Sequence, residues 1–197
     1  AVNGLGAITV AAVTAGSKIS SFFVAVTDAL GVTMATYCGQ NVGAGKLDRV
    51  REGVKVATII GIIYSAIVFI FMIFIGGELP KLFIDASKTD VIEKARIFLL
   101  WNSGFYFALI FVNVWRNSIQ GMGFPMFAII SGICEMFARG IVGFVGVKYF
   151  GFVAACMGSP LAWVIADIFL IPGFLYCLKK LGKVFGEKQT REEFQYE

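Results

Sequence analysis

Long apolar runs separated by short polar, glycine-containing stretches dominate the sequence. A helix needs about 20 apolar residues to cross a hydrocarbon core of about 30 Å. Five runs approach this length, and none shows the alternation of polar and apolar residues that a membrane β-strand requires. The runs are residues 9–39, 56–75, 97–115, 124–147 and 153–178. The pattern predicts an all-α, polytopic transmembrane bundle with about five spans, followed by a frayed polar tail at 179–197.

Glycine and proline fall between the runs, where they favour the end of one helix and the start of the next. The breakers are Gly39, Gly43, Gly45, Gly76, Gly77, Pro80, Gly121, Gly123, Pro125 and Gly151. The run at 97–115 is treated as one uncharged span. The segment from Glu78 to Ile84 is expected to form a short interfacial helix on the outer side.

The composition excludes several functional classes. Of 197 residues, 58% are hydrophobic and 15% are charged, which is too few charges to cover a soluble domain. The net charge of +4 comes without a basic stripe carrying interleaved aromatics, so no nucleic-acid partner is expected. There is no His, and the four cysteines form no CxxC pair, which argues against a metal site, a disulfide framework and an enzyme.

The basic residues of the loops predict an orientation. Ten fall on one side of the predicted spans and five on the other. The richer side includes 46–55, Arg116 and 179–191, and the positive-inside rule places it in the cytoplasm. We therefore expect a multi-pass plasma-membrane protein with a cytoplasmic C-terminus and an external N-terminus. Residues 1–6 then resemble the trailing end of one further span.

Charged residues inside the spans are costly and demand a reason. Glu135 and Arg139 are four residues apart on one helix and can pair, either as a switch or as a neutralised packing pair. Asp167 shares a face with Trp163 and Pro160, and it either lines a cavity or pairs with another helix. Asp28 lies on a small, polar face, which favours a cavity over a helix contact.

A polar stripe runs along the uncharged third span. On a straight helix, Asn102, Tyr106, Asn113 and Asn117 fall within about 40° of one another. Such a stripe points away from lipid. It is either a wall of a substrate passage or a set of hydrogen bonds between helices.

Several motifs in fixed order resemble the multidrug and toxic compound extrusion (MATE) family. The most specific is the run of residues 39–46, which reads Gly-Gln-Asn-Val-Gly-Ala-Gly-Lys and ends the first span. The others are Asn3-Gly4-Leu5-Gly6, Arg116-Asn117-Ser118-Ile119-Gln120-Gly121-Met122-Gly123, Glu135-Met136-Phe137-Ala138-Arg139, and Ser159-Pro160-Leu161-Ala162-Trp163 with Asp167. Together they extend over essentially the whole chain.

The resemblance implies a fold and a function. MATE transporters have two six-helix lobes around a central cavity, and residues 1–197 resemble the second lobe without most of its first helix. The missing N-terminal lobe, the lipid bilayer and small cationic substrates are the implied partners. The implied activity is export of organic cations or drugs in exchange for H⁺ or Na⁺, with no cofactor. Some sodium-linked members carry an acidic residue in the fourth helix of this lobe, and residues 97–115 have none.

Two other functions stay open. A lipid-linked oligosaccharide flippase of the same superfamily would line its cavity with several Arg and Lys, whereas Arg139 is the one deeply placed cation that the sequence indicates. A non-transporting membrane scaffold would use the buried charges for packing alone.

Overall fold

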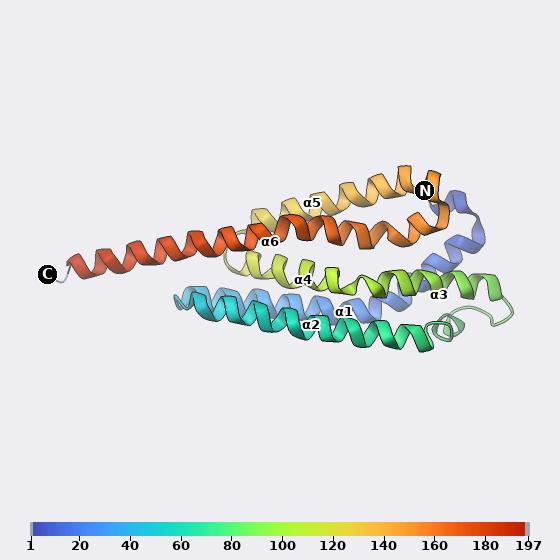
Figure 1. Ribbon diagram of the computed structural model, residues 1–197, viewed down its shortest axis with the longest axis horizontal. Helices are drawn as coiled ribbons and strands as arrows, with labels where there is room; N and C mark the ends of the chain where they lie inside the picture. The colour runs from blue at the N-terminus through green and yellow to red at the C-terminus, as the bar shows by residue number, and fades with distance from the viewer. Residues whose placement is uncertain (1, 196–197) are drawn as a thin grey trace.

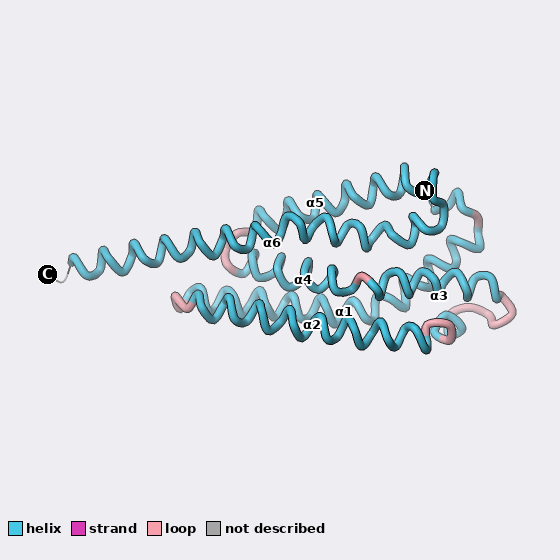
Figure 2. The backbone as a smooth tube through the Cα atoms, viewed as in Figure 1, coloured by secondary structure: helices cyan, strands magenta, loops and turns pink. Residues whose placement is uncertain are grey.

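The chain folds as a bundle of long helices in a computed structural model, which describes the backbone of residues 2–195 and the side chains of residues 4–186 (Figures 1 and 2). A short 3-10 helix at Val2–Leu5 comes first. The main helices are α1 (Ala7–Gly43), α2 (Leu47–Ile75), α3 (Thr89–Gly104), α4 (Tyr106–Gly121), α5 (Pro125–Ile141) and α6 (Val147–Gln195). The described residues contain no β-strand. This confirms the predicted all-α fold.

Three helical stretches are long and apolar enough to cross a membrane, or four if the bent pair of α3 and α4 counts as one span. Residues 7–43, 47–75 and 125–186 each satisfy the requirements for a span, and α3 with α4 satisfies them as a bent pair. The stretch 125–186 doubles back after α5, because α5 and α6 lie side by side (Figure 1). It therefore supplies two passes, and the total matches the five predicted spans.

Two helices end in the same glycine-based turn, as the breakers predicted. After α1, Gly45 adopts φ 70°, and the Lys46 and Gly45 amides donate to the carbonyls of Asn41 and Val42. After α4, Gly123 adopts φ 91°, and the Phe124 and Gly123 amides donate to Ile119 and Gln120. Both are Schellman caps, in which a left-handed glycine satisfies the last carbonyls. Pro125 then begins α5, where its missing N–H costs nothing.

The hairpin between α5 and α6 turns through irregular helix. Residues Val142–Gly146 form a π-helical segment, and Gly151 leaves helical geometry with φ 55° and ψ −127°. A residue with a side chain adopts this backbone conformation only under strain, so Gly151 is the point where the chain changes direction. The sequence predicted this break.

The third span is not one straight helix, which corrects the interpretation of residues 97–115. It bends by 48° between α3 and α4. Sharp bends commonly occur at Gly/Ser pairs, and Ser103-Gly104 lies at this point. The Ser103 hydroxyl donates to the carbonyl of Leu100 at 3.3 Å, which competes with the backbone ladder.

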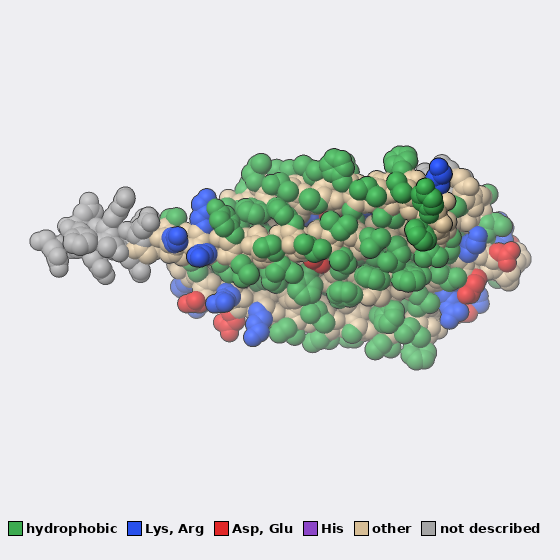
Figure 3. All heavy atoms as spheres, turned by 45° about the horizontal axis from the view of Figure 1, so that its top comes forward, with side chains coloured by type: hydrophobic (Ala, Val, Ile, Leu, Met, Phe, Trp, Pro, Cys, Tyr) green, Lys and Arg blue, Asp and Glu red, His purple; other side chains and the backbone are tan. Residues whose placement is uncertain are grey.

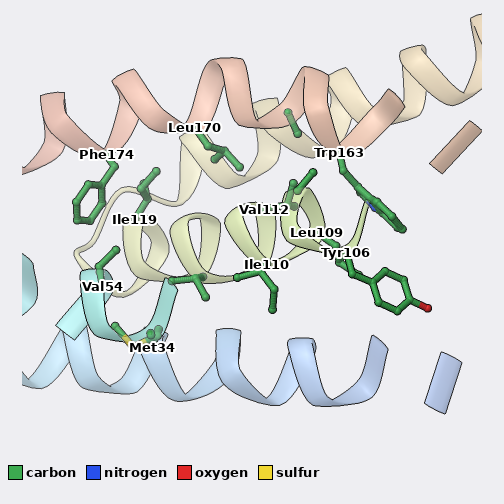
Figure 4. Packing of buried hydrophobic residues seen from close by; sticks show 14 of the residues in the cluster. Met34, Val54, Tyr106, Leu109, Ile110, Val112, Ile119, Trp163, Leu170 and Phe174 are labelled. Atoms are coloured by element: carbon green, nitrogen blue, oxygen red, sulfur yellow. The ribbon is translucent and has the colours of Figure 1, made fainter. Parts of the chain in front are cut away.

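α4 is the centre of the packing. Tyr106, Ile110 and Val114 are each 0% exposed. They and their neighbours contact residues of α1, α2 and α6 (Figure 4). The face of the bundle seen in Figure 3 is mostly hydrophobic in its middle part, with most of its Lys, Arg, Asp and Glu at the two ends. This distribution fits a bundle whose flanks contact lipid.

Two smaller expectations have mixed outcomes. The predicted interfacial helix is present as a 3-10 turn over Leu79–Leu82. The tail was expected to be frayed, but α6 continues as helix to Gln195. Residues 196–197 of that tail lie outside the described residues.

Candidate substrate and ion site

One exposed face of α1 carries five polar residues, although Val32, which is 63% exposed, also lies on it. Thr14, Lys18, Ser21, Asp28 and Thr36 are all exposed and fall within about 80° of one another at 100° per residue. By contrast, the exposed face of α2 is aliphatic and aromatic along its length, from Val56 to Phe74. The face of α1 is therefore a poor lipid surface and a good wall for an aqueous passage.

Asp28 is the charged group in the middle of that face. It lies 15 residues before the end of α1, which is roughly 22 Å along the helix. The side-chain amide of Asn113 on α4 donates to Asp28 Oδ1 at 2.8 Å and to Thr27 Oγ1 at 2.9 Å. The carboxylate is thus oriented by a neighbouring helix while remaining accessible. One turn later on α4, the Asn117 amide donates to the carbonyl of Asn113 and lies against Gly31 of α1.

The other residues of the predicted polar stripe lie inside the bundle. Asn102 is 3% exposed and donates to Phe98 within α3 and to the carbonyl of Cys156 on α6. Tyr106 is 0% exposed, and its hydroxyl is 2.5 Å from Ser20 Oγ. Trp163 packs against the Tyr106 ring with centroids 6.2 Å apart (Figure 4). The 48° bend separates Asn102 of α3 from Tyr106 and Asn113 of α4. Asn102 and Tyr106 connect helices, because their side chains are buried and bond to α6 and α1 respectively.

A second group of charges connects α4 and α5. We call Arg116, Ser131, Glu135 and Arg139 the ion-pair cluster. Arg139 Nη2 donates to Glu135 Oε2 at 2.9 Å, so the expected i, i+4 pair forms. Arg116 of α4 donates through Nη2 to Glu135 Oε1 and through Nε to Ser131 Oγ at 2.8 Å. The Ser131 hydroxyl donates in turn to the carbonyl of Ala128.

Arg116 is the residue that the sequence interpretation placed wrongly. It was assigned to the cytoplasmic loop, and Arg139 was taken as the one deeply placed cation. The Arg116 side chain is 24% exposed and that of Arg139 is 47% exposed, so Arg116 is the more buried of the two. The available signal was its place in the chain, because it follows the apolar run directly and precedes the helix-ending Gly121 by five residues.

Asp167 of α6 lies beside this cluster. It is half-buried, its Oδ1 atom is buried, and no described group donates a hydrogen bond to that atom. Arg116 attracts it electrostatically. Pro160 and Pro172 interrupt the hydrogen-bond ladder of α6 on either side. Asp167 is therefore a carboxyl group with a spare acceptor at a locally weakened point of its helix.

A cavity of about 690 Å³ lies at the end of the bundle that holds the loop before α3. The first half of α1 and the loop before α3 line it, with Lys18, Asp85 and Asp90 among its charged residues. Hydrogen bonds from Ser87 hold the pKa of the Asp85 carboxyl below its usual value. Among the residues that the structure describes, no three His, Cys, Asp or Glu side chains gather as a bound metal would require.

Three carboxyl groups and three basic groups lie in the spans. The carboxyl groups are Asp28, Glu135 and Asp167, and the basic groups are Lys18, Arg116 and Arg139. Glu135 pairs with both arginines, whereas Asp28 has an amide partner and no ion-pair partner among the described residues. An accessible, oriented carboxylate in a membrane span can bind a cation or a proton.

Comparisons with solved structures identify the same fold. A MATE protein in the bent conformation superposes with a TM-score of 0.77 at 19% identity, over 86% of this chain and 38% of that one. The inward-facing conformation of a multidrug resistance MATE family transporter of the MOP superfamily gives 0.78 at 20% identity, over 86% and 39%. The chain thus spans less than half the length of these proteins.

Sequence comparisons place the chain in a family. An FAD transporter of Shewanella oneidensis is 23% identical over 127 residues, which are 64% of this chain and 28% of that protein. The MatE family model matches residues 1–145, well over half of the chain. The chain therefore belongs to the MatE family of membrane transporters.

Proposed function

We propose that the complete gene product containing this chain is a secondary active antiporter that exports organic cations in exchange for H⁺ or Na⁺. The observation that carries the proposal is the accessible carboxylate of Asp28 on the polar face of α1, held by Asn113 of α4. A carboxylate in a membrane span is costly unless something charged uses it. The moving ions need no cofactor, and nothing in the proposal calls for an enzyme activity.

Exchange follows if the two cations compete for the same carboxyl groups. A cationic drug that binds Asp28 displaces a proton or Na⁺, and the ion gradient then drives the drug outward. The affinity of each site for one ion falls when the other is bound, which is the reciprocal coupling that antiport requires. Alternating exposure of the site is supported by the family fold, in which two lobes rock around a central site.

A cation fits this site better than an anion such as FAD. The related protein named as an FAD transporter makes an anionic cargo the main competing candidate. Two arginines are present in the spans, but Glu135 binds both of them. The polar face of α1 carries Asp28 near its middle and Lys18 nearer its start, and the carboxylate of Asp28 would repel phosphate groups. The same argument disfavours an anionic lipid-linked cargo.

We also propose that residues 1–197 form part of the second lobe. The polar face of α1 would then meet the other lobe across the central passage. The share of the solved MATE chains that this chain covers fits a lobe of a longer transporter.

We propose a cytoplasmic location for the basic end of the bundle in the plasma membrane. The positive-inside rule supports it, because Lys46, Arg49 and Lys55 lie at the start of α2. Lys55→Cys should react with a membrane-impermeant maleimide only after cells are permeabilised, whereas Lys88→Cys in the opposite loop should react on intact cells. The reverse labelling pattern would refute this orientation.

The function is tested directly by exchange in proteoliposomes. The complete gene product is reconstituted, and uptake of tetraphenylphosphonium is measured against outward H⁺ or Na⁺ gradients. The proposal predicts gradient-dependent uptake of the cation and none of FAD. Uptake of FAD without uptake of the cation would establish the anionic alternative, and transport of neither would favour a scaffold.

A further inference from the structure

Asp167 is a charged group that the proposed cargo site does not use. It lies on α6, whereas Asp28 lies on α1, and its buried Oδ1 has no hydrogen-bond donor among the described residues. A buried carboxylate oxygen without a donor is costly as an anion. The cost disappears when the carboxyl group carries a proton, because the neutral acid loses its strong need for donors.

Asp167 is linked to two other helices through charged side chains. Arg116 of α4 attracts the Asp167 carboxylate electrostatically. Glu135 of α5 holds Arg116 through an ion pair, and Arg139 of α5 holds the other oxygen of Glu135. Arg116 therefore interacts with carboxyl groups on two different helices. In this structure it donates hydrogen bonds to Glu135 and Ser131.

We propose that Asp167 is a proton-binding site that controls which carboxylate holds Arg116. This inference rests on the proposed antiport and assigns one of its proton sites. When Asp167 is protonated, Arg116 stays on Glu135 and Ser131, as in this structure. When the proton leaves to water, the Asp167 carboxylate competes for the guanidinium. The hydrogen bond from Arg116 Nη2 to Glu135 then breaks, and one to Asp167 Oδ1 forms.

This exchange has a mechanical consequence. Arg116 lies on α4 below the 48° bend at Ser103-Gly104, and Asp167 lies between the two prolines of α6. When the guanidinium moves from Glu135 to Asp167, α4 exchanges an ion pair with α5 for an ion pair with α6. The bend between α3 and α4 and the prolines of α6 are points where the backbone can adjust to this exchange.

A proton fits this position better than Na⁺. The guanidinium of Arg116 is close enough to attract Asp167, and it would repel a metal cation placed at the same oxygen. A proton instead neutralises the carboxyl group and leaves the Arg116–Glu135 pair intact. Thus the site is expected to respond to pH and to be indifferent to Na⁺.

Infrared difference spectroscopy on the complete gene product, without substrate, tests the site itself. The wild type is expected to show a protonated-carboxyl band that titrates with pH and is unchanged by Na⁺. Asp167→Asn should remove the band, and Asp90→Asn, at an exposed position in the first turn of α3, should keep it. If Asp167→Asn fails to fold, Asp167→Glu is expected to shift the band. A band that the Asp167 variant leaves unchanged, or the absence of any band in the wild type, overturns the proposal.

Proton release separates this proposal from the proposed function. Binding of tetraphenylphosphonium to weakly buffered, detergent-solubilised wild type should release protons, and Asp167→Asn should bind the cation with much less release. Failure of the wild type to bind the cation would refute the cation cargo and leave the infrared result to decide on Asp167. Equal release by the wild type and Asp167→Asn would refute the role of Asp167 in coupling.

Discussion

Replacing Asp28 with Asn is expected to abolish cation transport by the complete gene product while leaving the fold intact. The substitution keeps the shape of the side chain, and the Asn113 amide at 2.8 Å still finds an oxygen to accept its hydrogen bond. What disappears is the negative charge. A charge pair at about 4 Å and an effective dielectric constant of about 20 is worth about 4 kcal/mol. Screening by water in the passage lowers this, and we expect about a tenfold to hundredfold loss of affinity for tetraphenylphosphonium.

The measurement is equilibrium binding and proteoliposome uptake of tetraphenylphosphonium, with Asp90→Asn as the matched control. Asp90 is an exposed carboxylate in the first turn of α3, and its neutralisation should leave uptake at the wild-type level. Asn113→Ala should have an intermediate effect, because it removes the orienting amide and keeps the charge. Wild-type affinity in Asp28→Asn would show that the carboxylate does not bind the cargo.

Replacing Glu135 with Ala is expected to cause a large loss of stability. Glu135 is 5% exposed and is the shared acceptor of Arg116 and Arg139. Its removal leaves Arg116, which is 24% exposed, without its ion pair to Glu135. Breaking a buried ion pair by removing one partner costs about 3–5 kcal/mol. The midpoint of thermal unfolding in detergent should therefore fall markedly.

Two further variants distinguish the ion pair from simple packing. Arg139→Ala should cost much less than Glu135→Ala, because the Arg139 side chain is 47% exposed. Replacing Glu135 and Arg116 together by Leu should recover part of the stability lost with Glu135 alone, because Arg116 is then no longer left without its glutamate. If the double variant is as unstable as the sum of the two single variants, the residues do not act as a pair.

The hydrophobic pattern was sufficient to predict the architecture. Span number and helix ends depend on local chemistry, namely apolar run length and left-handed glycines. Gly45 and Gly123 adopt the positive φ values that end α1 and α4, as their sequence context indicated. The Glu135–Arg139 contact was also predictable, because four residues on one helix fix the separation of the two side chains.

Features that depend on packing between helices were not predictable. The stripe of Asn102, Tyr106 and Asn113 was drawn on a straight helix, and the bend at Ser103-Gly104 divides it. The depth of Arg116 depends on where α5 places Glu135, which no periodicity within α4 can indicate. Likewise, the donor that orients Asp28 comes from a helix 85 residues away in the sequence.

The central claim is that the polar face of α1 lines a water-filled passage, and cysteine accessibility tests it most directly. Cys134, which is partly exposed, is first replaced by Ala in the complete gene product. Ala25→Cys, one turn from Asp28 on the exposed face, is compared with Ile63→Cys on the exposed apolar face of α2. In proteoliposomes, Ala25→Cys should react quickly with a charged thiol reagent and be protected by tetraphenylphosphonium, whereas Ile63→Cys should react slowly. Slow reaction at both positions would mean that the α1 face lies against lipid or protein, which would contradict the proposed passage.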